Sequence, residues 1–207
     1  MTNKKHIRHN RNKYLERRED VRIHSFVWAA FFAALTAVGG WIKIPVPYVP
    51  FTLQIAAVYL AGCLLGPKIG ALSQLLYVLI GLAGAPVFAE GGGLGYIWKP
   101  TFGYLLGFIA GAYTCGLLVR RFQWTRARDI LMANAAALLV VYVFGCAWLY
   151  IAMKWIAGAP LSIGQTLWFG FLLPVPGDLV LCAVCSVIAA RVWPRVRPIM
   201  MTRGMGG

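Results

Sequence analysis

The sequence predicts an all-α membrane protein with six transmembrane helices and both termini in the cytoplasm. Its 207 residues are 60% hydrophobic and only 13% charged, whereas soluble domains contain about 25% charged residues. Long apolar runs recur along the chain, and the basic residues gather in alternate connecting segments. These three observations exclude an ordinary soluble domain.

Six apolar runs carry at most one charged residue each and define the expected helices. A helix needs roughly 17–25 residues to cross the hydrocarbon core of a bilayer, and the second and third runs are at the short end of this range. The expected helices are 23–42, 51–66, 69–88, 101–119, 130–153 and 175–190.

The distribution of Lys and Arg sets the orientation. With the N-terminus inside, 17 of the 20 Lys and Arg fall in cytoplasmic segments, and only Lys43, Lys99 and Lys154 fall outside. Such asymmetry is the positive-inside pattern, and it requires an even number of crossings if both termini are cytoplasmic. The net charge of +14 is thereby explained by topology, and nucleic acid is not an expected partner.

The chain divides into one membrane domain and two tails. Residues 1–22 form a basic cytoplasmic tail suited to contact with anionic lipid, residues 23–193 the membrane domain, and residues 194–207 a short basic cytoplasmic tail. The first apolar run is too long for a signal peptide and is expected to be retained as a span.

Polar residues gather at the outer ends of the expected helices. Gln54 opens the second run, Lys99 and Thr101 open the fourth, Asp178 opens the sixth, and Glu90 lies in the loop before the fourth. Because polar groups near hydrocarbon are costly, they usually face a cavity or the bundle interior. The pattern predicts one binding site on the outer side.

Each of these residues also has an ordinary interpretation. Lys99 can extend to the membrane interface beside aromatic residues, Asp178 can cap a helix whose dipole favours a carboxylate, Gln54 can bond a neighbouring helix, and Glu90 can be a solvated loop residue. Three polar residues nearer the inner side are expected to make interhelical contacts, namely Ser73, Gln74 and Asn134.

The segment Gly84–Phe108 contains Gly91, Gly92, Gly93 and Gly95. Glycine adopts positive φ readily and lets the backbone approach a ligand, so this segment is interpreted as a lid. It has no phosphate-loop pattern, and ATP is not expected to bind this chain.

No catalytic or metal-binding pattern is present. The three histidines lie in or near the N-terminal tail, and the five cysteines lie in apolar runs. Cys182 and Cys185 form a C-x-x-C pair without the further ligands that a zinc site needs. We expect the cysteines to pack as small apolar residues.

Four stretches of the sequence are distinctive when taken together, namely "IPVPYVPFTLQ", "LAGCLLGPKIGALSQLLYVLIGLAGAPVFAEGGG", "KPTFGYLLGF" and "LPVPGDLV". They resemble the BioY family, the biotin-specific substrate-binding (S) components of energy-coupling-factor (ECF) transporters. The resemblance covers about residues 25–192. It implies an S-component bundle in a prokaryotic plasma membrane that captures biotin from outside with high affinity. It also implies a transmembrane coupling subunit and two ATPase subunits as partners, with ATP on the ATPases and no cofactor on this chain.

Family S components dock the coupling subunit through small residues four apart on the first helix. In this sequence, Ala29 with Ala33 and Ala30 with Ala34 supply that spacing; the alternative is close packing inside the bundle. In one respect the chain departs from the family, which often has Lys three residues after the Asp of P-G-D. Leu181 occupies that position, and Lys99 is the substitute we consider.

The resemblance and the residue chemistry together give a candidate site for biotin. Asp178 would accept hydrogen bonds from the ureido N–H groups, since charged acceptors make the stronger bonds, and Lys99 would pair with the valerate carboxylate. Gln54, Thr101 and loop backbone N–H groups would complete the polar contacts, and four aromatic rings would form the apolar wall. The full candidate set is Gln54, Phe88, Glu90, Gly92, Gly93, Tyr96, Trp98, Lys99, Thr101, Tyr104 and Asp178.

Three other functions remain open at this point. The chain could be an S component for another vitamin, or a transporter that works without the ATPase module. A membrane enzyme could use Glu90 and Asp178 as acid and base, although the outer set lacks a nucleophile or metal group.

Overall fold

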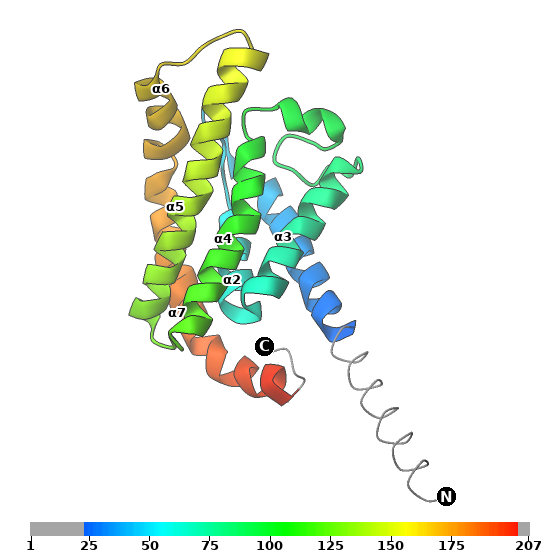
Figure 1. Ribbon diagram of the computed structural model, residues 1–207, viewed down its shortest axis with the longest axis vertical. Helices are drawn as coiled ribbons and strands as arrows, with labels where there is room; N and C mark the ends of the chain where they lie inside the picture. Colours follow the sequence, from blue (N-terminus) through cyan, green and yellow to red (C-terminus); the bar gives the residue numbers. More distant parts are fainter. Residues whose placement is uncertain (1–22, 203–207) are drawn as a thin grey trace, which may run out of the picture.

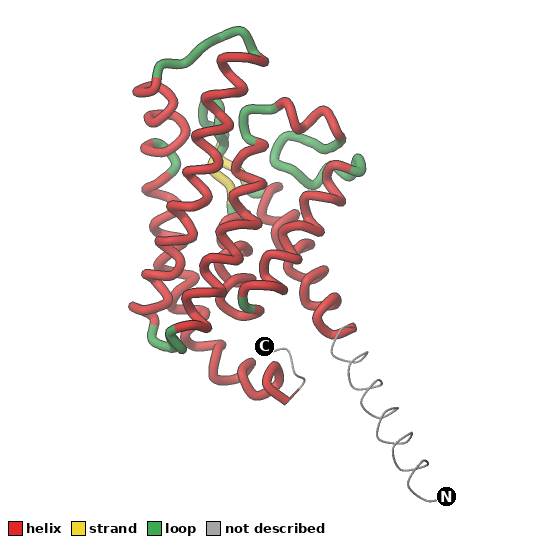
Figure 2. Tube along the Cα trace, in the orientation of Figure 1, coloured by secondary structure: helices red, strands yellow, loops and turns green. Residues whose placement is uncertain are grey.

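The computed structural model describes residues 23–202, which form a bundle of helices with one short β-hairpin (Figures 1 and 2). The predicted tail 1–22 lies outside the described residues. The predicted C-terminal tail is helical as far as residue 202 because the last helix continues through it. The main helices are Ile23–Trp41, α2 (Gln54–Leu65), α3 (Pro67–Leu82), α4 (Phe102–Arg121), α5 (Ala127–Ile151) and α7 (Val175–Thr202).

The bundle has two distinct ends. The start of the first helix and the end of α7 lie at the lower end of Figure 1, whereas the loop before α4 and the connection after α5 lie at the upper end. Both described chain ends are therefore on one side of the bundle. The candidate site belongs to the opposite half.

The helices differ in length from the predicted spans. Four helical segments of the described chain are long and apolar enough to cross a membrane, while α2 and α3 have only 12 and 16 residues. The helix α3 ends at Leu82 rather than near 88, because Gly84 has a φ of 112° and Pro86 follows it. These two residues are typical helix terminators.

The last helical segment begins earlier than predicted. It runs over Ile163–Arg195, through α6 (Ile163–Leu167), the π-helical turn η3 (Trp168–Leu172) and then α7. Ser162 starts it with a capping box, since its hydroxyl accepts from the Gln165 backbone N–H at 3.2 Å and the Gln165 side chain accepts from the Ser162 N–H at 2.9 Å. This S-x-x-Q pattern marks a helix start, but the predicted sixth helix did not take it into account. A second π-helical turn, η2 (Ala152–Ile156), extends α5.

The proline-rich connector before α2 is a β-hairpin. Its strands β1 (Lys43–Ile44) and β2 (Phe51–Thr52) are antiparallel, with Lys43 opposite Thr52. The three prolines lie between the strands, where no ladder N–H is required. At the tip, Tyr48 has a φ of 65° and its ring lies 5.1 Å from that of Phe169 in η3. The hairpin is thus held against the bundle.

The helix α4 is central and packs against α2, α3 and α5. Glycines allow its close approach to α5: a Cβ added to Gly107 would lie 2.8 Å from the backbone of Val141. A second glycine also allows close packing of α4 and α5, since the ring of Tyr104 in α4 fills the space beside Gly145 in α5. This close packing fixes the relative positions of α4 and α5, which both line the candidate site.

Gln74 and Asn134 make the predicted interhelical contacts, whereas Ser73 Oγ donates to the Gly70 carbonyl within α3 at 2.7 Å. Gln74 Nε2 donates to Thr36 Oγ1 at 3.2 Å, and Asn134 Nδ2 donates to Ser186 Oγ at 2.9 Å. Four cysteines are buried and Cys146 is half-buried. Within residues 23–202 no group of three or more His, Cys, Asp or Glu is placed to hold a metal ion.

Candidate substrate-binding site

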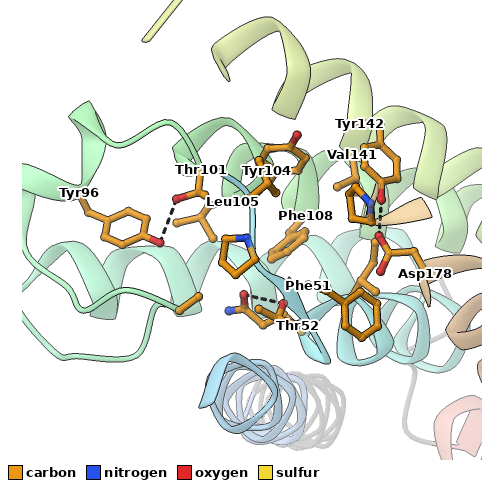
Figure 3. A pocket seen from close by; sticks show the side chains of 16 residues that line it. Phe51, Thr52, Tyr96, Thr101, Tyr104, Leu105, Phe108, Val141, Tyr142 and Asp178 are labelled. Carbon is orange, nitrogen blue, oxygen red and sulfur yellow. Dashed lines mark hydrogen bonds between the residues drawn. The ribbon is translucent and has the colours of Figure 1, made fainter. Parts of the chain in front are cut away.

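A cavity of about 60 Å³ lies where the hairpin meets the helix ends. It is lined by the hairpin, the start of α2, the loop before α4, and α4, α5 and α7 (Figure 3). Five of the predicted residues line it together, which are Gln54, Tyr96, Thr101, Tyr104 and Asp178. The structure therefore brings some, but not all, of the predicted polar residues together in one cavity.

Asp178 lies in the first turn of α7 and is 8% exposed. Its Oδ2 accepts a hydrogen bond from the Tyr142 hydroxyl at 2.5 Å, which is the only hydrogen bond to this carboxylate from the described residues. Gly177 lets the helix start approach the hairpin, since an added Cβ would lie 2.5 Å from the ring of Phe51. The carboxylate benefits from the helix dipole and also has lone pairs left for a ligand.

Gln54 opens α2 and is 3% exposed. Its Nε2 donates to the Tyr77 hydroxyl, and its Oε1 accepts from Thr52 Oγ1 at 3.2 Å. Tyr77 in turn donates to the Val87 carbonyl at 3.2 Å. Gln54 therefore bonds a neighbouring helix, as its ordinary interpretation required, and lines the cavity as well.

Tyr96 and Thr101 form a second hydrogen-bonded pair, in which Thr101 Oγ1 donates to Tyr96 Oη at 3.1 Å. Tyr96 belongs to the short helix η1 (Leu94–Trp98) in the loop before α4. Burial raises the pKa of its hydroxyl to about 12, so the phenol stays neutral at physiological pH. In Figure 3 this pair and the Asp178–Tyr142 pair lie at opposite ends of the cavity.

The wall between the two polar ends is largely apolar. Leu105 and Phe108 of α4, Val141 of α5 and Ile55 of α2 line it. Tyr104 adds its ring, while its hydroxyl donates to the Gly170 carbonyl at 2.7 Å and is thereby occupied.

Lys99 and Glu90 lie outside the cavity and form an ion pair of 3.0 Å, with side chains 41% and 38% exposed. The Lys99 ammonium is also 5.5 Å from the centre of the Tyr96 ring. The lysine is thus near the Tyr96 end of the cavity without lining it.

The other predicted residues belong to the loop rather than the cavity surface. Phe88 is 2% exposed, with its ring centre 4.5 Å from that of Tyr96, and Trp98 is 63% exposed. Gly93 has a φ of 94° and donates to the Gly81 carbonyl at 2.7 Å, which ties the loop to α3, and Gly92 lies against Ala85. Their role in binding remains a prediction.

Several cavity residues were not predicted. Tyr142 was hidden inside the fifth apolar run, although a phenol within a membrane span usually has a hydrogen-bond partner, which is a usable signal. Phe51 and Thr52 line the cavity beside Gln54. The hairpin also bonds the loop directly, because Lys43 Nζ donates to the Ala89 carbonyl at 2.6 Å.

The alanines of the first helix differ in exposure. Ala29 and Ala33 are 0% and 3% exposed, whereas Ala30 and Ala34 are exposed. Ala30, Ala33 and Ala34 line an apolar groove of about 690 Å³ between the first helix and α3. Leu181, at the position where the family often has Lys, is partly buried against the core.

These features define a membrane-embedded binding protein, with a cavity that is apolar along its length and polar at both ends. The sequence matches the BioY family over residues 10–198, and the chain belongs to this family. It is 43% identical to "Probable biotin transporter BioY" of Lysinibacillus sphaericus, over 82% of this chain and 86% of the relative. It is 38% identical to "Biotin transporter BioY" of Thermotoga maritima, over 82% of this chain and 95% of the relative.

The fold has a solved counterpart. The crystal structure of the S-component for biotin from an ECF-type ABC transporter superposes with a TM-score of 0.72, covering 83% of this chain and 91% of that chain, at 23% sequence identity. The predicted all-helical S-component-like bundle is confirmed at the level of the fold.

Proposed function

We propose that this protein captures biotin at the outer side of the membrane and mediates its uptake as the S component of an ECF transporter. The observation that carries the proposal is the Asp178–Tyr142 pair at one end of a cavity whose middle wall is largely apolar, in a chain of the BioY family. Its relatives are described as biotin transporters, which favours transport over the enzyme alternative.

The two ends of the cavity suit the two polar ends of biotin. The ureido N–H groups would donate to Asp178, and the thiophane ring would lie against the apolar wall. The valerate tail would then extend toward Tyr96 and Thr101. Lys99, 5.5 Å from the Tyr96 ring, would attract the carboxylate as the tail leaves the cavity.

Selectivity would follow from the buried polar groups. An analogue without the ureido group leaves the Asp178 carboxylate unpaired in a buried site, which is costly. A site of this kind discriminates against other vitamins more strongly than an apolar pocket alone.

The ATP-driven step would belong to partner subunits, since no phosphate-loop pattern occurs in the sequence. A coupling membrane subunit and two ATPase subunits would complete the transporter in a prokaryotic plasma membrane. The exposed Ala30–Ala34 face with its apolar groove would offer the coupling subunit a close-packing surface. This chain would cross the membrane six times with both termini inside, α2 and α3 being completed by their adjoining loops.

Equilibrium binding of labelled biotin to the purified protein tests the proposal. We expect saturable binding that unlabelled biotin displaces and that riboflavin and thiamine do not. Displacement by another vitamin, or no binding of biotin, would refute the assignment. Uptake by cells that express this chain with and without an ATPase module then separates an S component from a stand-alone transporter.

A further inference from the structure

The ring of Tyr142 is held by two other aromatic rings. Its centre lies 4.9 Å from that of Phe171 at an interplanar angle of 83°, and 6.1 Å from that of Tyr104 at 88°. Both contacts are edge-to-face, an arrangement that aromatic pairs prefer. The Tyr142 hydroxyl donates to Asp178 Oδ2 at 2.5 Å, and the two side chains point toward one another in Figure 3. The aromatic contacts therefore restrict how the phenol meets the carboxylate.

Phe171 differs from the other members of this group because it does not line the cavity, whereas Tyr104, Tyr142 and Asp178 do. Its side chain is half-buried and packs against the core from the π-helical turn η3. The effect of Phe171 on a bound substrate is therefore indirect, through the Tyr142 ring that it contacts.

The turn that carries Phe171 is attached to two other parts of the cavity wall by the residues just before it. The Gly170 carbonyl accepts from the Tyr104 hydroxyl at 2.7 Å. The ring of Phe169 lies 5.1 Å from that of Tyr48 at the tip of the hairpin. Single π-helical turns within α-helices are frequent at functional sites. This one is anchored to α4 and to the hairpin, so the position of Phe171 is well defined.

We propose that Phe171 is a positioning residue of the substrate site, which holds the Tyr142 ring so that its hydroxyl stays on the Asp178 carboxylate. Without this contact the phenol would tilt away, and the carboxylate would lose its only hydrogen bond from the described residues. An ionised carboxylate can accept about four hydrogen bonds, so the carboxylate held in this way still accepts from a substrate. The effect on biotin rests on the proposed function, whereas the effect on the Tyr142–Asp178 bond does not.

The substitution Phe171→Leu removes the ring and keeps an apolar side chain. We expect biotin to bind about three- to tenfold more weakly, as for the loss of one edge-to-face contact. Phe171→Tyr keeps the ring and should bind as the wild type does. Phe144→Leu, the same change at an exposed position of α5, is the matched control and should not alter affinity. Unchanged affinity in Phe171→Leu, or an equal loss in Phe171→Tyr, would overturn the proposal.

A double-mutant cycle on the ligand-free protein tests whether Phe171 acts through the Tyr142 hydroxyl. Tyr142→Phe removes that hydroxyl and should lower the melting temperature, because it leaves the buried Asp178 carboxylate without its donor. The decrease should be smaller in a Phe171→Leu background, since coupled residues are not additive. An equal decrease in both backgrounds, or none in either, would show that Phe171 only fills space.

Two further outcomes are separated by this design. If Phe171→Leu does not fold, Phe171→Met takes its place in the cycle, because a methionine side chain fills irregular gaps without a ring. If the wild-type protein fails to bind biotin, the proposed function falls and the cycle still decides the role of Phe171. If biotin binds and the cycle shows no coupling, the positioning role alone is refuted.

Discussion

At the scale of single residues, some side chains that line the cavity could be predicted from the sequence and others could not. Asp178, Gln54 and Thr101 could be predicted because a polar residue at the end of an apolar run is rare and costly. Tyr142 could not be assigned in the same way, because only the packing of α5 against α7 brings its hydroxyl to Asp178. The spacing of Tyr142 and Asp178 in the sequence does not indicate that their side chains are close in the fold.

Asp178→Asn should weaken biotin binding about ten- to hundredfold. A hydrogen bond to a charged group contributes about 1.5–3 kcal/mol, and each 1.4 kcal/mol is a factor of about ten in affinity. Isothermal titration calorimetry on the purified variant measures the change. Asp129→Asn, at the start of α5 beside Arg128, is the control and should bind as the wild type does; equal affinity of both variants would exclude Asp178 as a ligand.

Lys99→Ala should have a smaller and more specific effect. Exposed ion pairs contribute about 0.2–1 kcal/mol, so we expect biotin affinity to fall about two- to fivefold. Affinity for a biotin amide without the carboxylate should stay the same. Lys154→Ala is the matched control, since the ammonium of this lysine lies 5.4 Å from the centre of the Trp155 ring and the residue does not line the cavity. Equal losses for biotin and its amide would show that Lys99 does not contact the carboxylate.

At the scale of elements, the apolar runs predict which segments are helical better than they predict where helices end. The third run continues to 88, but α3 stops at Leu82 because Gly84 and Pro86 turn the chain. The three prolines between Ile44 and Phe51 mark a break between two helices, whereas the pairing of Lys43 with Thr52 depends on contacts across the turn. The hydrophobicity of a segment indicates that it lies in an apolar environment. It does not distinguish a helix from an apolar loop that packs against a helix.

The crossing of α4 and α5 should be sensitive to one methyl group. Gly107→Ala places a Cβ about 2.8 Å from the Val141 backbone, and overpacking of this kind costs about 1–3 kcal/mol. Thermal unfolding in detergent should show a lower melting temperature. Gly164→Ala, in α6 where the nearest atom is 3.9 Å away, should be neutral or stabilising because alanine favours the helix; similar results for both would argue against the tight crossing.

At the scale of the whole molecule, the cavity proposed to bind biotin and the groove proposed to dock the coupling subunit are separate surfaces. The cavity lies among the hairpin, α4, α5 and α7, whereas the groove with Ala30 and Ala34 lies between the first helix and α3. The sequence predicted four alanines as one docking set. In the structure Ala30, Ala33 and Ala34 line the groove, whereas Ala29 does not, because residues one position apart on a helix point about 100° apart.

Ala34→Trp should abolish biotin uptake and leave biotin affinity unchanged. The bulky ring would fill the groove that the coupling subunit is proposed to occupy, without reaching the cavity. Uptake by cells carrying the complete transporter and binding by the purified chain give the two readouts. Ala135→Trp, at an exposed position of α5, should preserve both, and a loss of binding with Ala34→Trp would favour a packing role inside the bundle.

The hairpin between the first helix and α2 also affects how copies of this protein behave beside one another. Two-stranded ribbons have unpaired edges, which can recruit strands from other molecules and start aggregation. Here the strands are only two residues long, and three of the six residues between them are prolines without an N–H group. In a crowded membrane the ribbon is therefore a poor template for self-association.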